Sequence, residues 1–324
     1  MSTTSVDAAP TPRPAEGGNR FTRPWRDPSI SFQRALALVL LICQGGITVT
    51  GAIVRVTGSG LGCDTWPLCH EGSLVPVQGV TPWVHQLIEF GNRLLAFVVA
   101  AAAAAVLVAV IRARRSPGVK ALAWISLLGV VLQAVIGGIS VRLDLQWWSV
   151  AIHFLPSMVL VWVAGVLYMR VAETDGAEPT ERYAAPIRAL VVAAAVALSF
   201  VLVTGTMVTG SGPHSGDSGV GMDGRLNMDT ETLAYVHAAC MYVYLICTLV
   251  AVYQLRRTNA PKDAYKTGLV LIALIVIQWA IGVTQFRLGV PRWTIPAHIA
   301  MSSAVVAFSA ILYAHGKRRL PTLR

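Results

Sequence analysis

Residues 133–153 read QAVIGGISVRLDLQWWSVAIH, and residues 278–298 read QWAIGVTQFRLGVPRWTIPAH. The two stretches are identical at seven positions that share one offset of 145 residues. The seven pairs are Gln133 and Gln278, Ile136 and Ile281, Gly137 and Gly282, Arg142 and Arg287, Leu143 and Leu288, Trp148 and Trp293, and His153 and His298. An earlier segment repeats too, because TGSG at 57–60 recurs at 209–212. The chain therefore contains one unit duplicated in tandem.

Long apolar runs surround both copies of this repeat. Hydrophobic residues make up 55% of the 324 positions and charged residues only 13%, so the expected solvent is a bilayer. Each run has about the 20 residues needed to cross the hydrocarbon core as a helix. Barrel strands would instead alternate over about 10 residues. The runs lie near residues 34–54, 83–111, 119–141, 147–170, 187–208, 231–255, 267–286 and 293–315.

These runs predict an all-α polytopic membrane protein with eight transmembrane helices, four in each repeated unit. Since a unit with an even number of helices enters and leaves on the same side, the two units should be related by a pseudo-twofold axis along the membrane normal. We expect two side-by-side four-helix bundles, whose interiors can supply ligands to a cofactor. The predicted divisions are a disordered tail (1–33), an N-terminal bundle (34–170), a linker (171–186), a C-terminal bundle (187–316) and a basic tail (317–324).

The net charge of +10 reflects membrane topology and not nucleic-acid binding, because the basic residues form no patch with interleaved aromatic residues. Basic residues precede the first run, follow the last, and join the second run to the third and the sixth to the seventh. By the positive-inside rule both termini face the cytoplasm. The first 30 residues lack an apolar core of the signal-peptide kind, so we expect a disordered cytoplasmic tail on a multi-pass protein of the plasma membrane.

Cys63 and Cys69 bracket a short segment of the first outer loop. This face is oxidising, so a disulfide is the expected state of the pair. A redox-active pair and a metal site are the alternatives, although the spacing lacks the usual zinc pattern and no second Cys/His pair accompanies it.

Four of the seven histidines lie within apolar runs, where a polar side chain is costly unless it faces the bundle interior and finds a partner. These four are candidates for function: His85, His153, His237 and His298. A structural alternative for any one of them is a hydrogen bond to a neighbouring helix. The other three adjoin loops or the basic tail, and we expect them to be solvated: His70, His214 and His315.

Three of the four candidate histidines, His153, His237 and His298, share a depth near the outer leaflet. Trp148 and Trp293 each precede a histidine by five residues, about 7.5 Å along a helix, and tryptophans favour the interface. His237 and His298 lie at similar depth on different helices, an arrangement that suits a planar macrocycle bound at both axial positions. Such a macrocycle would carry electrons, because its metal has no free position.

The two halves differ at one of these positions, because the offset of 145 maps His237 onto Asn92. Glu89 and Asn92 lie within about 40° of His85 around the second helix, so the three share a face. The second half has alanine where the first has Glu89 and Arg93, so the first half is expected to do chemistry. The alternative for Glu89 is a structural ion pair with Arg93 at i+4.

Arg142 and Arg287 stand at equivalent outer ends of the third and seventh helices. Two interpretations are equally good. Each side chain can extend to the membrane interface, or each guanidinium can bind a haem propionate.

The pattern resembles the haem A synthase family of eight-helix membrane proteins over residues 34–316. The family's outer-loop cysteine pair is matched by Cys63 and Cys69, and its catalytic glutamate by Glu89. Its haem ligands on the fourth, sixth and eighth helices are matched by His153, His237 and His298. The chain departs from the family at two positions, because Asn92 replaces a second-helix histidine and Ala238 an arginine.

The resemblance implies an oxidoreductase acting on a CH or CH2 group, which oxidises the C8 methyl of haem O to the formyl of haem A. It implies His237 and His298 as axial ligands of a haem b cofactor, His153 as a ligand of the substrate iron, and Glu89 near the methyl group. His85, Asn92 or no residue would fill the missing ligand position. The implied partners are haem O synthase, terminal-oxidase assembly factors and a membrane electron acceptor such as a quinone.

Two other functions fit parts of the pattern. A bis-histidine cytochrome b without haem-modifying activity would need equivalent ligand sets in both halves, which Asn92 argues against. A haem transporter or assembly chaperone would use the cysteine pair as a redox switch.

Overall fold

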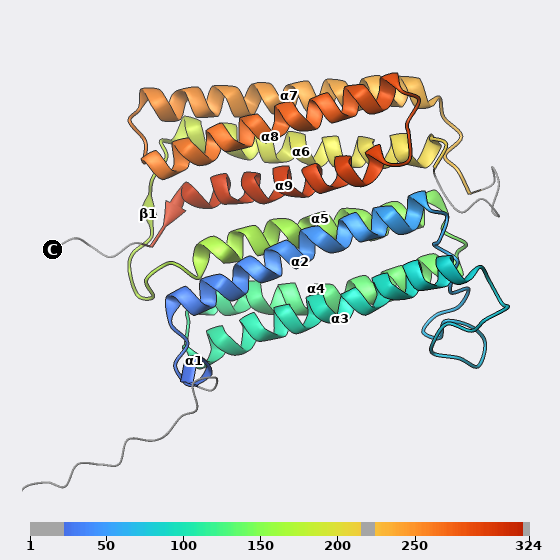
Figure 1. Cartoon of the computed structure of the whole chain (residues 1–324). Helices are drawn as coiled ribbons and strands as arrows, with labels where there is room; N and C mark the ends of the chain where they lie inside the picture. Colours follow the sequence, from blue (N-terminus) through green and yellow to red (C-terminus); the bar gives the residue numbers. More distant parts are fainter. Residues whose placement is uncertain (1–22, 215–223, 320–324) are drawn as a thin grey trace, which may run out of the picture.

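The computed structural model describes residues 23–214 and 224–319, and helices dominate this part of the chain (Figure 1). Eight of the described helices are long and apolar enough to cross a membrane, which confirms the all-α polytopic prediction. They are α2 (Ile30–Val56), α3 (Trp83–Arg112), α4 (Pro117–Arg142), α5 (Trp147–Arg170), α6 (Ala185–Ser211), α7 (Thr230–Arg257), α8 (Lys262–Arg287) and α9 (Thr294–His315). The remaining elements are α1 (Arg23–Arg26) and an antiparallel pair of two-residue strands, β1 (Thr180–Glu181) and β2 (Lys317–Arg318).

Two described segments near the ends of the chain form regular secondary structure within the predicted tails. Helix α1 and the first turn of α2 fall within the range 1–33, for which a disordered tail was predicted; residues 1–22 of that range lie outside the described residues. Helix α2 begins at Ile30 because the Ser29 side chain caps it, accepting the N–H of Phe32 at 3.2 Å. At the other end, β2 lies within the predicted basic tail and pairs with the linker strand β1.

The helices form two groups of four, α2–α5 and α6–α9 (Figure 1). Corresponding helices make corresponding contacts: α2 packs on α3 and α4 on α5 in the first group, as α6 packs on α7 and α8 on α9 in the second. Between the groups, α9 contacts α2 and α5, and α5 contacts α6. The predicted pseudo-twofold axis would generate this pattern of neighbours; the axis itself stays a prediction.

The fourth helix of each unit lies at the centre of the molecule, where α5 and α9 pack together. A Cβ added at Gly165 of α5 would lie 3.0 Å from the Ala310 Cβ and 3.2 Å from the Ala307 carbonyl oxygen of α9. Small residues at this contact therefore allow the two backbones to approach closely, as is common between membrane helices.

The duplicated unit keeps one interhelical hydrogen bond in both copies. Ser157 of α5 donates to the Gln133 side chain of α4 at 2.9 Å. At the equivalent positions, Gln278 of α8 donates to the Ser302 hydroxyl of α9 at 2.7 Å. Each such bond adds only about 0.6 kcal/mol in membrane proteins, but it fixes which faces of the paired helices meet.

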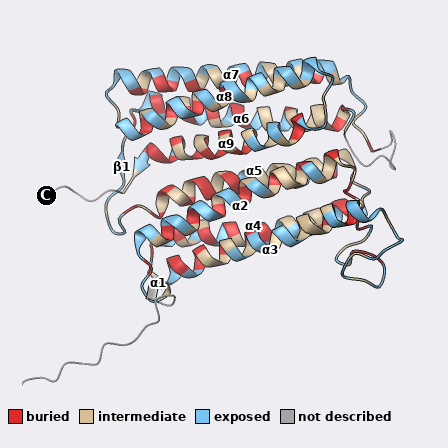
Figure 2. Ribbon diagram, in the orientation of Figure 1, coloured by how far each residue is buried: buried red, intermediate tan, exposed pale blue. Residues whose placement is uncertain are grey.

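Along the helices, buried residues alternate with exposed ones (Figure 2). The exposed side chains include many large hydrophobic ones, among them Phe97, Phe200 and Ile246. Such a surface would be unstable in water but matches lipid, in which the contacts between helices depend on close packing and polar bonds.

At the end of the molecule that carries β1 and β2, the linker is bound by a buried arginine. Arg115, between α3 and α4, forms an ion pair with Asp175 of the linker at 2.5 Å. It also donates to the backbone carbonyls of Val171 and Glu173, each at 2.7 Å, and to the Gln33 side chain at 3.0 Å. This one guanidinium joins the linker to α2 and to the start of α4.

Replacing Arg115 by methionine should lower the free energy of unfolding by about 3 kcal/mol, because two buried carbonyls and the Gln33 side chain lose their donor. Chemical unfolding of the purified protein in detergent measures the change. Arg188→Met is the matched control, since Arg188 forms an exposed ion pair with Glu181 and should contribute less than about 1 kcal/mol. Equal effects of the two substitutions would show that Arg115 does not hold the linker.

Candidate functional site

Two of the predicted ligands, His237 of α7 and His298 of α9, face each other in the second bundle. Their ring centres are 6.4 Å apart and the ring planes are inclined by 56°. An imidazole nitrogen lies about 2 Å from the metal that it ligates and the ring centre roughly 1 Å further, so two rings on opposite sides of one ion have centres about 6 Å apart. The pair thus has the separation of two axial ligands of one metal. Among the described residues, no group of three or more His, Cys, Asp or Glu side chains could hold a metal ion.

Hydrogen bonds determine which nitrogen of His237 is free. Its Nδ1 lies 3.0 Å from the Val201 carbonyl oxygen and 3.2 Å from the Thr204 hydroxyl, both on α6. Because a carbonyl only accepts, Nδ1 carries the hydrogen, and Nε2 keeps the lone pair that a metal needs. A second bond of this kind is typical of metal-ligating histidines, whose ring it orients.

His153 and His298 share a different feature, since the Nδ1 atom of each is buried without a hydrogen-bond partner in the described part of the chain. Leaving a buried polar atom unpaired costs about 1–3 kcal/mol. Each unpaired atom calls for an explanation, and a molecule bound beside either ring would supply one.

All three of these histidines pack against a glycine of the preceding helix. A Cβ at each glycine would lie 3.1–3.2 Å from the imidazole Cε1 atom. A side chain there would therefore push the ring away from its position. The pairs are Gly137 with His153, Gly205 with His237, and Gly282 with His298.

The first bundle has no counterpart of the His237 ring. Asn92 stands at that position on α3, and its side-chain oxygen accepts a hydrogen bond from Thr50 of α2 at 2.7 Å. His85 lies in the first turn of α3, where its backbone carbonyl packs against Gly62 of the outer loop. The two arginines that could bind propionates are exposed: Arg142 donates to the Trp66 carbonyl at 2.7 Å, and Arg287 stands at the end of α8.

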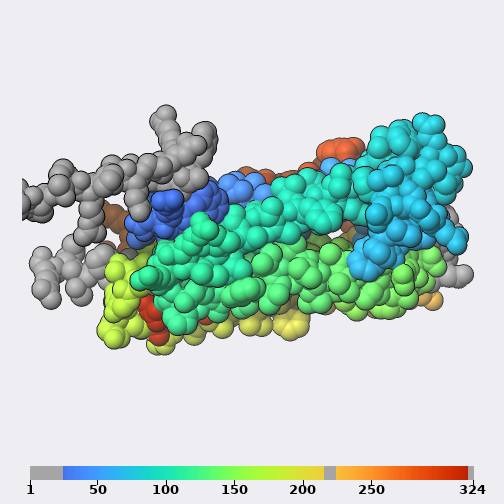
Figure 3. All heavy atoms as spheres, turned by 90° about the horizontal axis from the view of Figure 1, so that it is seen from below, coloured from blue at the N-terminus to red at the C-terminus, as the bar shows by residue number. Residues whose placement is uncertain are grey.

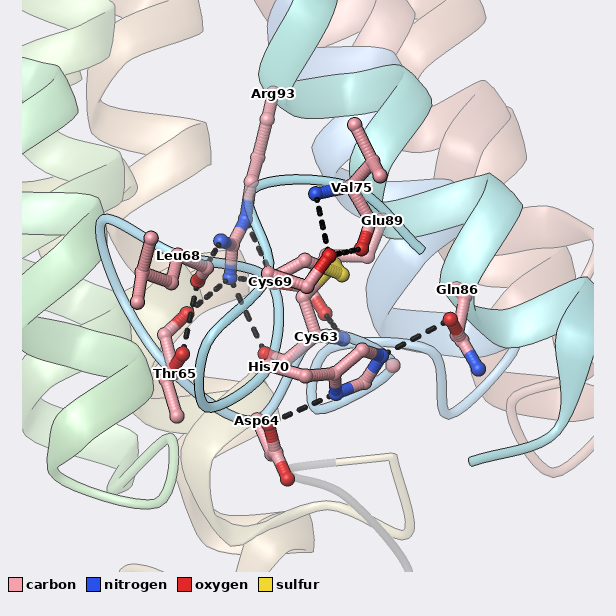
Figure 4. The surroundings of a disulfide bond; sticks show 12 residues. Cys63, Asp64, Thr65, Leu68, Cys69, His70, Val75, Gln86, Glu89 and Arg93 are labelled. Atoms are coloured by element: carbon pink, nitrogen blue, oxygen red, sulfur yellow. Dashed lines mark hydrogen bonds and ion pairs between the residues drawn. A yellow bond between two sulfur atoms is a disulfide. The ribbon is translucent and has the colours of Figure 1, made fainter. Parts of the chain in front are cut away.

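The first outer loop, residues 57–82, projects from one end of the first bundle (Figure 3). The predicted disulfide between Cys63 and Cys69 is confirmed, and both cysteines are fully buried. The seven residues that it closes into a ring lie directly over the outer turns of α3 (Figure 4). We refer to residues 63–69 as the disulfide ring.

Glu89 is only 5% exposed and holds the disulfide ring on α3. One carboxylate oxygen accepts the backbone N–H of Cys63 at 2.6 Å, and the other accepts from Arg93 at 2.6 and 3.1 Å (Figure 4). The i+4 ion pair with Arg93, considered above as a structural alternative, is therefore present. The bond to Cys63 shows that the pair serves the loop as well as the helix.

Arg93 completes the attachment, because its guanidinium also donates to three carbonyl oxygens of the ring. These bonds reach Leu68 at 3.0 Å, Thr65 at 3.0 Å and Cys63 at 3.2 Å. An arginine presents several donors in a fixed plane, so it can bind several carbonyls at once. A single ion pair on α3 thereby fixes both the disulfide ring and the orientation of Glu89.

The expectation that His70 and His315 are solvated is wrong, since they are 3% and 5% exposed. His70 lies between Asp64 and Gln86, and His315 is bonded to Thr267 and ion-paired with Asp263. The glycines and basic residues next to these two histidines in the sequence suggested exposure. Their burial depends instead on the partners just named, which lie 6 to 52 positions away along the chain. His214 is half-buried and lies 3.0 Å from the Val290 carbonyl oxygen.

Together, these features define a polytopic helical membrane protein whose long described helices form two groups of four. One group carries a pair of facing histidines, and the other a buried carboxylate under a disulfide ring. The family model COX15-CtaA, described as cytochrome oxidase assembly protein, matches residues 34–310. The chain belongs to this family, which confirms the resemblance drawn from its motifs.

Similar proteins named Heme A synthase occur in several bacteria. The chain is 36% identical to that of Geobacillus thermodenitrificans over 108 residues, which are 33% of this chain and 32% of the relative. It is 31% identical to that of Listeria welshimeri over 150 residues, or 44% of this chain and 47% of the relative. It is 34% identical to that of Geobacillus kaustophilus over 108 residues, which are 33% of this chain and 32% of the relative. The chain thus aligns with less than half the length of each relative.

Proposed function

We propose that this protein is a haem A synthase, an oxidoreductase that acts on a CH group by converting the C8 methyl of haem O to the formyl of haem A. Family membership and the names of the similar proteins support the proposal. The observation that carries it is the asymmetry of the halves, in which a metal-spaced histidine pair occupies one bundle and a buried carboxylate the other.

The second bundle would hold a resident haem b through His237 and His298. When bound, such a group would supply electron-transfer chemistry, because two histidine ligands leave no iron position for substrate. The residues of the chain prepare the site: Val201 and Thr204 hold the Nδ1–H of His237, so that Nε2 points away from α6. Gly205 and Gly282 leave room for the two rings.

The first bundle would hold the substrate haem O, with His153 as a ligand of its iron and Glu89 near the methyl group. Conversion of the methyl group to a formyl group requires two successive oxidations, through an alcohol and a hydrated aldehyde. The Glu89 carboxylate, oriented by Arg93 and the Cys63 N–H, can accept the proton of an attacking water and stabilise positive charge at the reacting carbon. The haem held by the second bundle would supply the electron-transfer chemistry that these oxidations need.

The remaining assignments belong to the same proposal. Arg142 and Arg287 would bind propionates, and His85, Asn92 or neither would complete the coordination of the substrate iron. The electron acceptor would be a membrane carrier such as a quinone, and haem O synthase and terminal-oxidase assembly factors would be partners. The protein would lie in the plasma membrane with both termini in the cytoplasm, as its basic loops indicate.

Pigment analysis tests the proposal directly. The full-length protein is purified from a host that makes haem O, and its extracted haems are separated and counted per chain. We expect haem b together with haem O or haem A, because the two bundles hold different haems. Two haem b molecules per chain, without haem O or A, would indicate a cytochrome b electron carrier instead.

A further inference from the structure

The side chain of Gln86, on the first turn of α3, is fully buried and makes four hydrogen bonds. Its amide nitrogen donates to the carbonyls of Val77 and Thr81, at 2.9 and 2.8 Å. Its amide oxygen accepts the backbone N–H of Val77 at 2.8 Å. These three backbone partners permit only one orientation of the amide, because the reverse would place donor against donor and acceptor against acceptor.

The fourth bond of Gln86 determines the protonation of His70. The His70 Nε2 atom lies 2.9 Å from the Gln86 amide oxygen, which can only accept, so Nε2 carries a hydrogen. The other ring nitrogen, Nδ1, lies 3.0 Å from the Asp64 carboxylate (Figure 4). The Asp64 side chain is about half exposed, and a carboxylate oxygen accepts hydrogen bonds. With an acceptor on each side, both ring nitrogens of His70 donate.

We infer that His70 is an imidazolium cation in the folded protein and a positioning residue that fixes the first outer loop over Glu89. Only the role of Glu89 in this inference rests on the proposed function. The charged groups that face His70 are Asp64 of its own loop and, from α3, Glu89, with Arg93 paired to it. A positive charge at His70 is therefore paired directly with the Asp64 carboxylate, which offsets the cost of burying it.

The position of His70 explains what the charge does. His70 directly follows Cys69 of the disulfide ring, while Gln86 binds Val77 and Thr81 of the returning segment of the loop. The His70 to Gln86 bond therefore joins both arms of the loop to α3. Loss of either ring proton would set a nitrogen lone pair against an acceptor, the Gln86 oxygen or the Asp64 carboxylate, and would weaken the attachment of the loop. Residues 63–69 would then move away from α3 more often. When they do, Glu89 would lose its hydrogen bond from the Cys63 N–H.

Nitrogen-15 NMR of histidine side chains, recorded on the full-length protein in lipid at neutral pH, tests the protonation state. The signals of His70 are assigned by their absence in His70→Gln. We expect both ring nitrogens of His70 to show directly bonded hydrogens. An unprotonated ring nitrogen at His70 would overturn the inference, whatever the variant does to stability.

The rate at which a water-soluble phosphine reduces the Cys63–Cys69 disulfide tests the positioning role. We expect His70→Phe to be reduced roughly tenfold faster than the unmodified protein, since charge-assisted hydrogen bonds are lost. His214→Phe is the matched control, because His214 lies in the corresponding outer loop and makes one bond to a backbone carbonyl. Equal rates for the two variants would overturn the positioning role. Neither measurement uses activity, so their outcome is independent of whether the protein makes haem A.

Discussion

Replacing Glu89 by glutamine should stop the conversion of haem O while leaving the haem of the second bundle in place. Glutamine keeps the size of the side chain and can still accept the Cys63 N–H, but it removes the charge that takes up a proton. General acid–base groups contribute about 10²- to 10⁴-fold to rates, so haem A formation should fall by at least about 100-fold. The ratio of haem A to haem O in pigment extracts measures conversion, and the absorption spectrum measures retained haem b.

Two comparisons separate catalysis from loop stability in this variant. Glu231→Gln changes an exposed carboxylate in the first turn of α7 and should leave haem A formation normal. The phosphine reduction rate of the disulfide in Glu89→Gln reports whether the ring still sits on α3. A normal yield of haem A from Glu89→Gln would contradict the catalytic role. A low yield with a fast-reducing disulfide would assign Glu89 to loop positioning instead.

Replacing either His237 or His298 by alanine should remove haem b from the protein. The two facing rings would hold the haem together, so either alanine would remove one of its two histidine ligands. Loss of even a supporting residue around a metal lowers affinity by about 10- to 100-fold, and loss of a ligand should do at least as much. The measurement is haem b per chain in the purified protein, from extracted pigment.

His153→Ala is the matched control for this pair, because it removes the equivalent histidine of the other half. It should keep haem b and lose haem O or haem A. If all three substitutions removed haem b equally, the proposal that the second bundle holds haem b and the first holds the substrate haem would be wrong. If His237→Ala and His298→Ala both kept a full complement of haem b, the ligand assignment would fail.

Much of the fold could be predicted because a bilayer imposes simple rules on the sequence. A spanning helix needs about 20 apolar residues, so each long run predicts one helix. The duplication was readable because Arg142, Trp148 and His153 recur at one offset. The structure explains two other residues of the repeat. Gly137 packs on His153, and the Gln133 side chain accepts a hydrogen bond from Ser157 of the next helix.

The outer-loop network could be predicted only in part, because its partners are distant along the chain. The Glu89 to Arg93 pair was foreseeable, since i+4 residues are neighbours on a helix. The bond from Cys63 to Glu89 spans 26 positions and that from His70 to Gln86 spans 16, and no local pattern indicates either. His70 and Gln86 were missed for this reason.

The close contact of α5 with α9 has a consequence for electron transfer. His153 lies on α5 and His298 on α9, and Gly165 and Ala310 hold the two helices backbone to backbone. The two helices that carry these histidines therefore form one packed unit, and the haem sites of the proposed enzyme would keep a fixed separation. Electron transfer between these sites would then need no movement of one bundle relative to the other.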